Sequence, residues 1–201
     1  MNAVLTDDDR AAGLSVVKID GEYYIDYTPV INARLHEVEQ EFQSHSLCDS
    51  HTINDPELTL ENIAWFIGQV NEYCPWDIKK ENSWKMQFGN VRHLSDMSDP
   101  IAYNGQVVRA ENLGNLTYGY WGRAMGWPAE ILYLGGGVVN QLGSAWKLTK
   151  ALVTDERDIW AWLNSLLNII KPSVYSDGSY GDGENDYIFI KQGVELYDTV
   201  H

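Results

Sequence analysis

The sequence predicts an α+β fold: a single, mostly helical domain with two or three β-hairpins. Apolar residues recur at helical spacing in several segments, and Asp-Gly and Asn-Gly pairs separate short β-prone runs. The chain contains no internal repeat and no coiled-coil heptads. With 201 residues, 44% of them hydrophobic, it is long enough to bury one substantial core.

The first predicted elements are a hairpin and a helix. Residues 14–27, LSVVKIDGEYYIDY, place two β-prone runs on either side of Asp20-Gly21, a dipeptide that favours a tight turn. Residues 29–43 carry apolar side chains at helical spacing, and Pro29 suits the first turn of a helix.

The boundary between two parts of the chain is predicted in the polar stretch that follows. We interpret residues 1–55 as an N-terminal hairpin and helix that could serve as a docking segment, and residues 56–201 as the main domain. The later elements are expected to be a helix over 57–72, a hairpin over 101–109 around Asn104-Gly105, a helix after Pro128, a helix over 155–170 and a closing helix capped by Asp186.

Charge is the strongest global feature of the chain. Lys and Arg total 14 against 29 for Asp and Glu, which gives a formal net charge of -15. Such a surface repels polyanions, and the densest basic cluster is only Lys79 and Lys80. The charge therefore argues against broad nucleic-acid binding, although an acidic protein can still contain a local cationic pocket.

Several classes of protein find no support in the sequence. No run of 18 apolar residues predicts a membrane span, and no signal peptide is visible at the N-terminus. Cys48 and Cys74 form no CxxC pair, so one disulfide and two free thiols both stay open. The histidines show no metal-binding spacing and LGGGV is no phosphate loop, so we expect neither a metal nor a cofactor.

An unusual stretch, GNLTYGYWGRAMGW, places glycines among large aromatic residues at positions 114–127. In a helix, Gly119, Gly122 and Gly126 share one face and form a smooth groove. Another helix could lie in this groove, and the LGGGV segment is a candidate. Alternatively, the groove is the floor of a ligand cleft, bordered by aromatic rings and polar groups. The residues that would line such a cleft are Asn115, Tyr118, Tyr120, Trp121 and Arg123.

Two further stretches offer carboxylates for chemistry. Asp182 and Asp186 lie in YGDGEND, where they could act as acid and base, could bind Ca²⁺ without the pattern of an EF-hand loop, or could belong to an ordinary loop and helix cap. The segment PWDIKK places Asp77 beside Lys79, after Trp76, either as a functional group or as a surface ion pair.

These three stretches, in this order, resemble the polymorphic toxin type 44 family, also called bacterial toxin 44. EYCPWDIK, LGNLTYGYWGRAMGW and YGDGENDYIFIKQGVELY are similar to the family patterns PGGPWDxK, WSNIHYGYxGRAxGF and GDDPxDxxxIxxGxxxY. The resemblance covers about residues 60–198. Thr117 stands where many members have His, and Gly183 and Glu184 replace an Asp-Pro pair, so Asp182 and Asp186 are the acidic residues that carry over.

The resemblance implies a toxin module that a secretion system or carrier protein delivers into competing bacteria and that a cognate immunity protein neutralises. It leaves the target open, although the family is regarded as enzymatic and as acting on RNA. We expect delivery into the periplasm of the target cell, with the cytoplasm as the alternative, and no stable insertion into a membrane.

Three functions remain as alternatives. A hydrolase of peptidoglycan glycan strands would use two carboxylates from among Asp77, Asp182 and Asp186, with Glu37 in reserve. Its substrate-binding residues would be Asn115, Tyr118, Tyr120, Trp121, Arg123, Lys79 and Trp76. A ribonuclease would use Asp182 or Asp186 as the base and Lys79 and Arg123 as cations. A non-enzymatic toxin would bind a protein through its aromatic surface. The acidic composition and the wealth of Trp and Tyr favour the glycan hydrolase.

Overall fold

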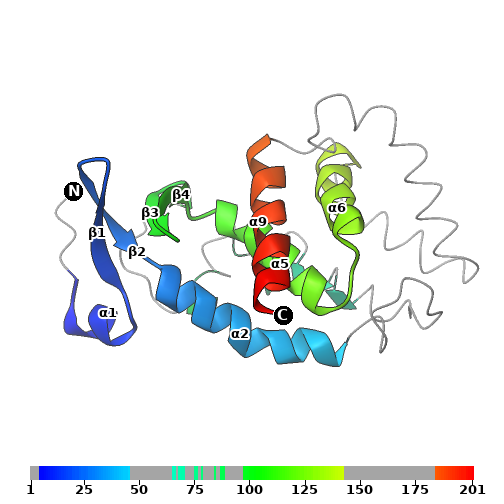
Figure 1. The fold of residues 1–201 in the computed structure, drawn as a ribbon, viewed down its shortest axis with the longest axis horizontal. Coiled ribbons are helices and arrows are strands. Elements are labelled where there is room, and N and C mark those ends of the chain that lie inside the picture. The colour runs from blue at the N-terminus through cyan, green and yellow to red at the C-terminus, as the bar shows by residue number, and fades with distance from the viewer. Residues whose placement is uncertain are drawn as a thin grey trace, which may run out of the picture.

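The computed structural model describes residues 5–45, 97–142 and 184–201, together with positions 65, 66, 68–70, 75, 76, 78, 84, 87 and 88. In chain order its elements are α1 (Asp7–Ala11), β1 (Ser15–Ile19), β2 (Glu22–Asp26), α2 (Thr28–Ser44), β3 (Pro100–Tyr103), β4 (Gln106–Arg109), α5 (Asn112–Ala124), α6 (Ala129–Leu142) and α9 (Glu184–Val200). The arrangement, shown in Figure 1, confirms the predicted class: an α+β, mostly helical single domain.

Both predicted hairpins are present, and each turns at the expected dipeptide. Asp20 and Gly21 have φ angles of 51° and 90°, and Asn104 and Gly105 have φ angles of 48° and 75°. Positive φ at both central residues matches the twist of the adjoining strands, which is why Asn-Gly and Asp-Gly are favoured in two-residue hairpins.

The two hairpins join into one sheet. Within the described residues its strand order is β1-β2-β3-β4, with antiparallel pairing inside each hairpin. Between the hairpins β2 and β3 run parallel, with Asp26 opposite Ala102, and the Tyr27 N–H donates to the Ala102 carbonyl at 3.0 Å. The N-terminal hairpin is therefore part of the same sheet as residues 100–109.

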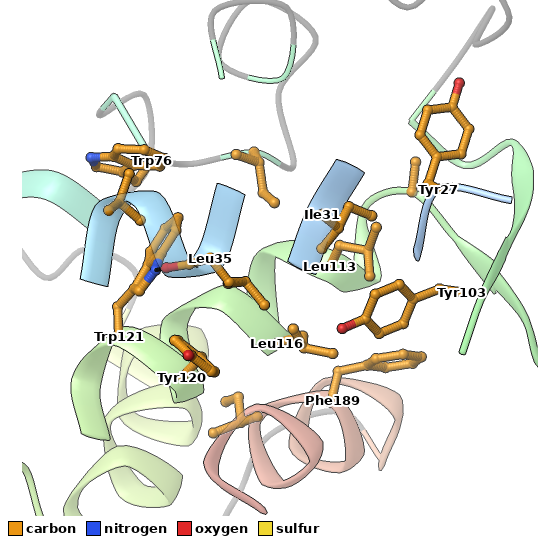
Figure 2. Packing of buried hydrophobic residues seen from close by; sticks show 14 of the residues in the cluster. Tyr27, Ile31, Leu35, Trp76, Tyr103, Leu113, Leu116, Tyr120, Trp121 and Phe189 are labelled. Atoms are coloured by element: carbon orange, nitrogen blue, oxygen red, sulfur yellow. Dashed lines mark hydrogen bonds between the residues drawn. The ribbon is translucent and has the colours of Figure 1, made fainter. Parts of the chain in front are cut away.

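Helix α2 confirms the helix predicted over residues 29–43. Asp26 Oδ1 accepts a hydrogen bond from the Thr28 N–H at the helix start, at 2.9 Å. The apolar positions of the pattern point inward and are almost completely buried: Ile31, Leu35, Val38 and Phe42. Because this face packs on α5, the N-terminal part of the chain shares a core with the later part, as Figure 2 shows for Ile31, Leu35, Leu113 and Leu116. A docking role for residues 1–55 stays a prediction.

Helices α5 and α9 run parallel and side by side. Asn115 contacts Asp186 near their first turns, Gly119 faces Ile190 further along, and Arg123 pairs with Asp198 near their ends. Figure 2 shows α5 (green) between α2 (blue) and α9 (red). Helix α5 is thus buried on opposite sides.

Helix α6 covers a further side of α5, and it confirms the helix predicted after Pro128. The side chain of Leu132 lies over Gly122, and the Tyr118 hydroxyl lies over Gly135. The glycine groove of α5 therefore accepts other helices, as one of the two interpretations predicted. The closest backbone approach comes from α9, however, whereas the LGGGV segment of α6 was the expected partner.

Of the two other predicted helices, one is described in part and the other is not described. Positions 65, 66 and 68–70 are helical, as expected for the helix over 57–72, whereas the helix predicted over 155–170 lies outside the described residues. The short helix α1 was not predicted, although Thr6 and Asp9 form a reciprocal capping box that marks its start. Among the described helices, none has the length and apolar character needed to cross a membrane.

Candidate functional site

A contact between Asn115 and Asp186 brings together two of the residues that the sequence singled out. The Asn115 side chain, only 7% exposed, donates a hydrogen bond from Nδ2 to Asp186 Oδ1. Asp186 is half-buried, and its Oδ2 atom has no hydrogen-bond partner among the described residues. The amide thus holds the carboxylate through one oxygen, and within the described part of the chain the other oxygen has no partner.

The local position of Asp186 differs from the expected one. Helix α9 begins at Glu184, so Asp186 lies inside the first turn and is not the residue that caps the helix. The unpaired N–H groups of a first helical turn carry partial positive charge, which favours a carboxylate there.

Two glycines set the position of Asp186 relative to Asn115. A Cβ atom on Gly119 would overlap the main-chain carbonyl oxygen of Ile190, and one on Gly193 would overlap that of Leu116. Only glycine allows the two helix backbones to lie this close. Asn115 and Asp186 each lie one helical turn before the contact of Gly119 with Ile190, so this contact brings their side chains together.

Two tyrosines follow this pair along its helices: Tyr118 comes three residues after Asn115, and Tyr187 comes directly after Asp186. Tyr118 packs against Phe66 with ring centroids 5.7 Å apart, and Tyr133 packs edge-on against Tyr187 at 5.3 Å. The pKa of Tyr133 is raised to about 12, chiefly by burial and then by Tyr187 and the negative charges of Glu195, Glu130 and Asp198. The described side chains around Tyr133 therefore include several carboxylates.

The aromatic rings expected to border an open cleft are mostly core residues. Tyr120 is 1% exposed and Trp121 is 0% exposed, and Trp121 stacks on Phe42 with centroids 5.0 Å apart. Trp76 is also buried and meets Trp121 edge-on at 4.4 Å (Figure 2). Their expected role in stacking a ligand is therefore corrected, because their faces are covered by other side chains.

Arg123, which was expected to face a ligand, has partners within the protein. Its Nε atom donates to Asp198 Oδ1 at 2.9 Å, and one terminal nitrogen donates to the Trp127 carbonyl at 2.7 Å. Eight residues of helix, about 12 Å, separate it from Asn115 along α5. Arg123 thus ties the ends of α5 and α9 to the turn before α6.

The remaining predicted site residues are Asp77, Lys79 and Asp182, and they lie outside the described residues. Their roles stay predictions. The described positions contain no group of three or more His, Cys, Asp and Glu residues that could hold a metal ion.

A polar cluster that the sequence reasoning missed lies at the far end of α9. Glu39, 6% exposed, is held by Tyr120, Gln43, His36 and His201. A sequence signal existed, because Glu39 follows Leu35 by one helical turn and so lies on the apolar face of α2. The acidic residue held in reserve from this helix was its exposed neighbour Glu37.

Comparison with known proteins places the chain in a family. The sequence model described as bacterial toxin 44 matches residues 65–199, well over half of the chain. The chain belongs to the bacterial toxin 44 family. This confirms the resemblance drawn from the three motifs, and the protein is therefore a bacterial toxin domain.

The matched region of the bacterial toxin 44 domain contains both partners of the Asn115–Asp186 contact, whereas α2 precedes it. The chain matches no curated protein and no solved structure. Membership is consistent with delivery to other bacteria and with neutralisation by an immunity protein in general, as the motifs implied.

Proposed function

We propose that this bacterial toxin 44 domain hydrolyses the glycan strands of peptidoglycan, with Asp186 as one of two acting carboxylates. The observation that carries the proposal is the contact in which the buried Asn115 amide orients Asp186 through Oδ1. Glycoside hydrolysis needs one carboxylic acid to protonate the leaving oxygen and one carboxylate to act as base or nucleophile. A carboxylate that is oriented through one oxygen suits the second role.

The acid is expected from the neighbouring acidic residues. Asp182 precedes Asp186 by four residues, and Asp77 follows the buried Trp76 in the PWDIKK segment. Of these two we favour Asp182, because it is closest in sequence to the oriented carboxylate. Tyr118 and Tyr187 contribute the aromatic and hydroxyl surface on which sugar rings commonly bind.

The electrostatics favour a glycan over a nucleic acid. Of the negative charges that help to raise the pKa of Tyr133, those of Glu195 and Asp198 lie on the same helix as Asp186, and the whole chain carries a net charge of -15. A ribonuclease needs cations at the scissile phosphate, and Arg123, one of the two expected to supply them, is paired with Asp198. Delivery into the periplasm, with peptidoglycan as substrate and a cognate immunity protein as partner, follows from this proposal.

Compartment-specific expression tests the proposal. The domain is produced in a Gram-negative host with and without an export signal, as wild type, as Asp186→Asn and as Asp198→Asn. The control variant makes the same change near the other end of α9. We expect rounding and lysis only with export, their loss in Asp186→Asn and their retention in Asp198→Asn.

Two outcomes would overturn the proposal. Growth arrest only without export would indicate a cytoplasmic target and favour the ribonuclease. Full toxicity of a folded Asp186→Asn variant would exclude this carboxylate from the active site.

A further inference from the structure

We propose that Glu39 is a positioning residue, which fixes the register of α9 and thereby the place of Asp186 beside Asn115. The proposal deepens the proposed function and rests on it for its catalytic meaning. Its structural part concerns a contact that can be measured without any substrate.

Glu39 connects three elements through one buried carboxylate. Tyr120 of α5 donates its hydroxyl proton to Oε2 at 3.0 Å, and Gln43 of α2 donates to Oε1 at 2.8 Å. His201, directly after α9, lies with Nε2 2.7 Å from Oε1, and His36 of α2 lies with Nδ1 3.3 Å from Oε2.

With Glu39 ionised, one set of donors and acceptors satisfies the contacts of this cluster, and it fixes the histidine tautomers. An ionised carboxylate only accepts hydrogen bonds, so His36 Nδ1 and His201 Nε2 must carry the protons that face it. Tyr120 gives its one proton to Glu39, so the single Nδ1 proton of His36 is shared between Glu39 Oε2 and the Tyr120 oxygen, which lies 3.2 Å from Nδ1. Burial and the hydrogen bond to Glu39 both raise the pKa of Tyr120, so this hydroxyl stays a donor at neutral pH.

A buried carboxylate is costly unless its oxygens are hydrogen-bonded. The donors that satisfy Glu39 come from separate elements, so the cost is offset only when α2, α5 and the end of α9 occupy one relative position. Tyr197 of α9 supports the same arrangement, because its ring packs edge-on against Tyr120 at 5.4 Å and stacks on His201 at 4.5 Å. The cluster thus fixes the position of the end of α9 relative to α2 and α5.

Because α9 is one continuous helix, fixing its C-terminal end also fixes the position of Asp186 near its start. About 22 Å of helix separates positions 186 and 201, and a helix moves as a rod when it slides along a neighbour. A shift of one residue at the Glu39 end, about 1.5 Å, would displace Asp186 from Asn115 by the same amount. Catalytic geometry tolerates little displacement of this kind.

Glu39 lies outside the segment that matches the family. Helix α2 ends at Ser44, before the matched region begins at position 65. Residues 28–44 would therefore belong to the working toxin, because they supply the carboxylate that holds α9 in register.

The test is the position of the Asn115 side-chain amide signals in nuclear magnetic resonance spectra of the isotope-labelled chain. These signals report directly on the contact with Asp186, and Asp186→Ala gives their position when the contact is absent. We expect Glu39→Gln, which keeps the shape of the side chain but removes its charge, to move them toward that position. Glu41→Gln, an exposed change on the same helix, should leave them unmoved.

Two further variants separate positioning from a general loss of stability. Val108→Ala removes buried apolar groups from β4, away from α9, and should leave the Asn115 signals in place even though it lowers the melting temperature. His201→Ala removes one donor to Glu39 and, if Glu39→Gln fails to fold, takes its place with the same expected shift.

Unmoved Asn115 signals in a folded Glu39→Gln or His201→Ala variant would overturn the positioning role. A shift of equal size in Val108→Ala would also overturn it. Cleavage of peptidoglycan by Asp186→Asn would instead contradict the proposed function alone, because the resonance test involves no substrate.

Discussion

Gly119 in α5 lies so close to the main-chain carbonyl group of Ile190 in α9 that a Cβ atom at position 119 would overlap the carbonyl oxygen. Gly193 makes the reciprocal approach to Leu116. Each glycine inside a helix costs up to about 1 kcal/mol relative to alanine. The close packing of two helix backbones is the compensation, and it places Asn115 against Asp186.

Replacing Gly119 with alanine tests this contact. A backbone carbonyl inside a helix cannot rotate away, so we expect Gly119→Ala to lower the free energy of unfolding by about 1–3 kcal/mol. Gly68→Ala is the matched control, because a Cβ atom there meets nothing within 4 Å. Denaturant unfolding of both variants measures the change in the free energy of unfolding. Equal stability of the two variants would contradict the close contact between Gly119 and Ile190.

Gly122 should tolerate alanine better than Gly119 but should not tolerate leucine. Its neighbour is the end of the Leu132 side chain, which can change rotamer to admit one methyl group. Leucine would overfill the interface with α6, so we expect Gly122→Leu to cost about 1–3 kcal/mol. Melting temperatures in the order Gly122→Ala above Gly122→Leu would agree with this packing, and an unchanged value for the leucine variant would mean that the face is open.

Arg123 is expected to contribute stability and not substrate binding. Its ion pair with Asp198 is partly exposed, and such pairs contribute about 0.2–1 kcal/mol. The hydrogen bond to the Trp127 carbonyl adds about 1 kcal/mol. Arg123→Gln should therefore lower the melting temperature modestly while toxicity survives below it. Loss of toxicity without loss of stability would restore the role in ligand binding.

The tyrosines predict how stability depends on pH. The pKa of Tyr133 is raised from 10.0 to about 12, and that of Tyr120 is also raised, chiefly by burial. Unfolded tyrosines ionise near pH 10, so this stability is complete below pH 10 and is lost as the pH rises toward 12. Denaturant unfolding across this range should show the decline, and Tyr133→Phe should make it shallower. A decline of the same slope in Tyr133→Phe would contradict the assignment.

The sequence predicted the elements well where local chemistry decides them. The Asp20-Gly21 and Asn104-Gly105 turns and the apolar face of α2 each follow from a few neighbouring residues. The capping box of Thr6 and Asp9 was equally local and was overlooked.

The orientation of side chains on α5 could not be predicted in the same way. Its Tyr and Trp residues occur on several faces, and the helix is buried by α2, α6 and α9, so no single polar side marks the solvent. The partner of Arg123 depends on where the end of α9 lies, and Glu39 finds its donors in distant segments. These features are set by tertiary packing, not by spacing.

The most direct test of the proposed activity is the release of glycan fragments from purified peptidoglycan. The account predicts that the wild-type domain releases soluble muropeptides with new glycan ends, that Asp198→Asn does so at a similar rate, and that folded Asp186→Asn releases none. Release by Asp186→Asn at the wild-type rate, or intact peptidoglycan after treatment with a wild-type protein that is toxic in cells, would contradict it.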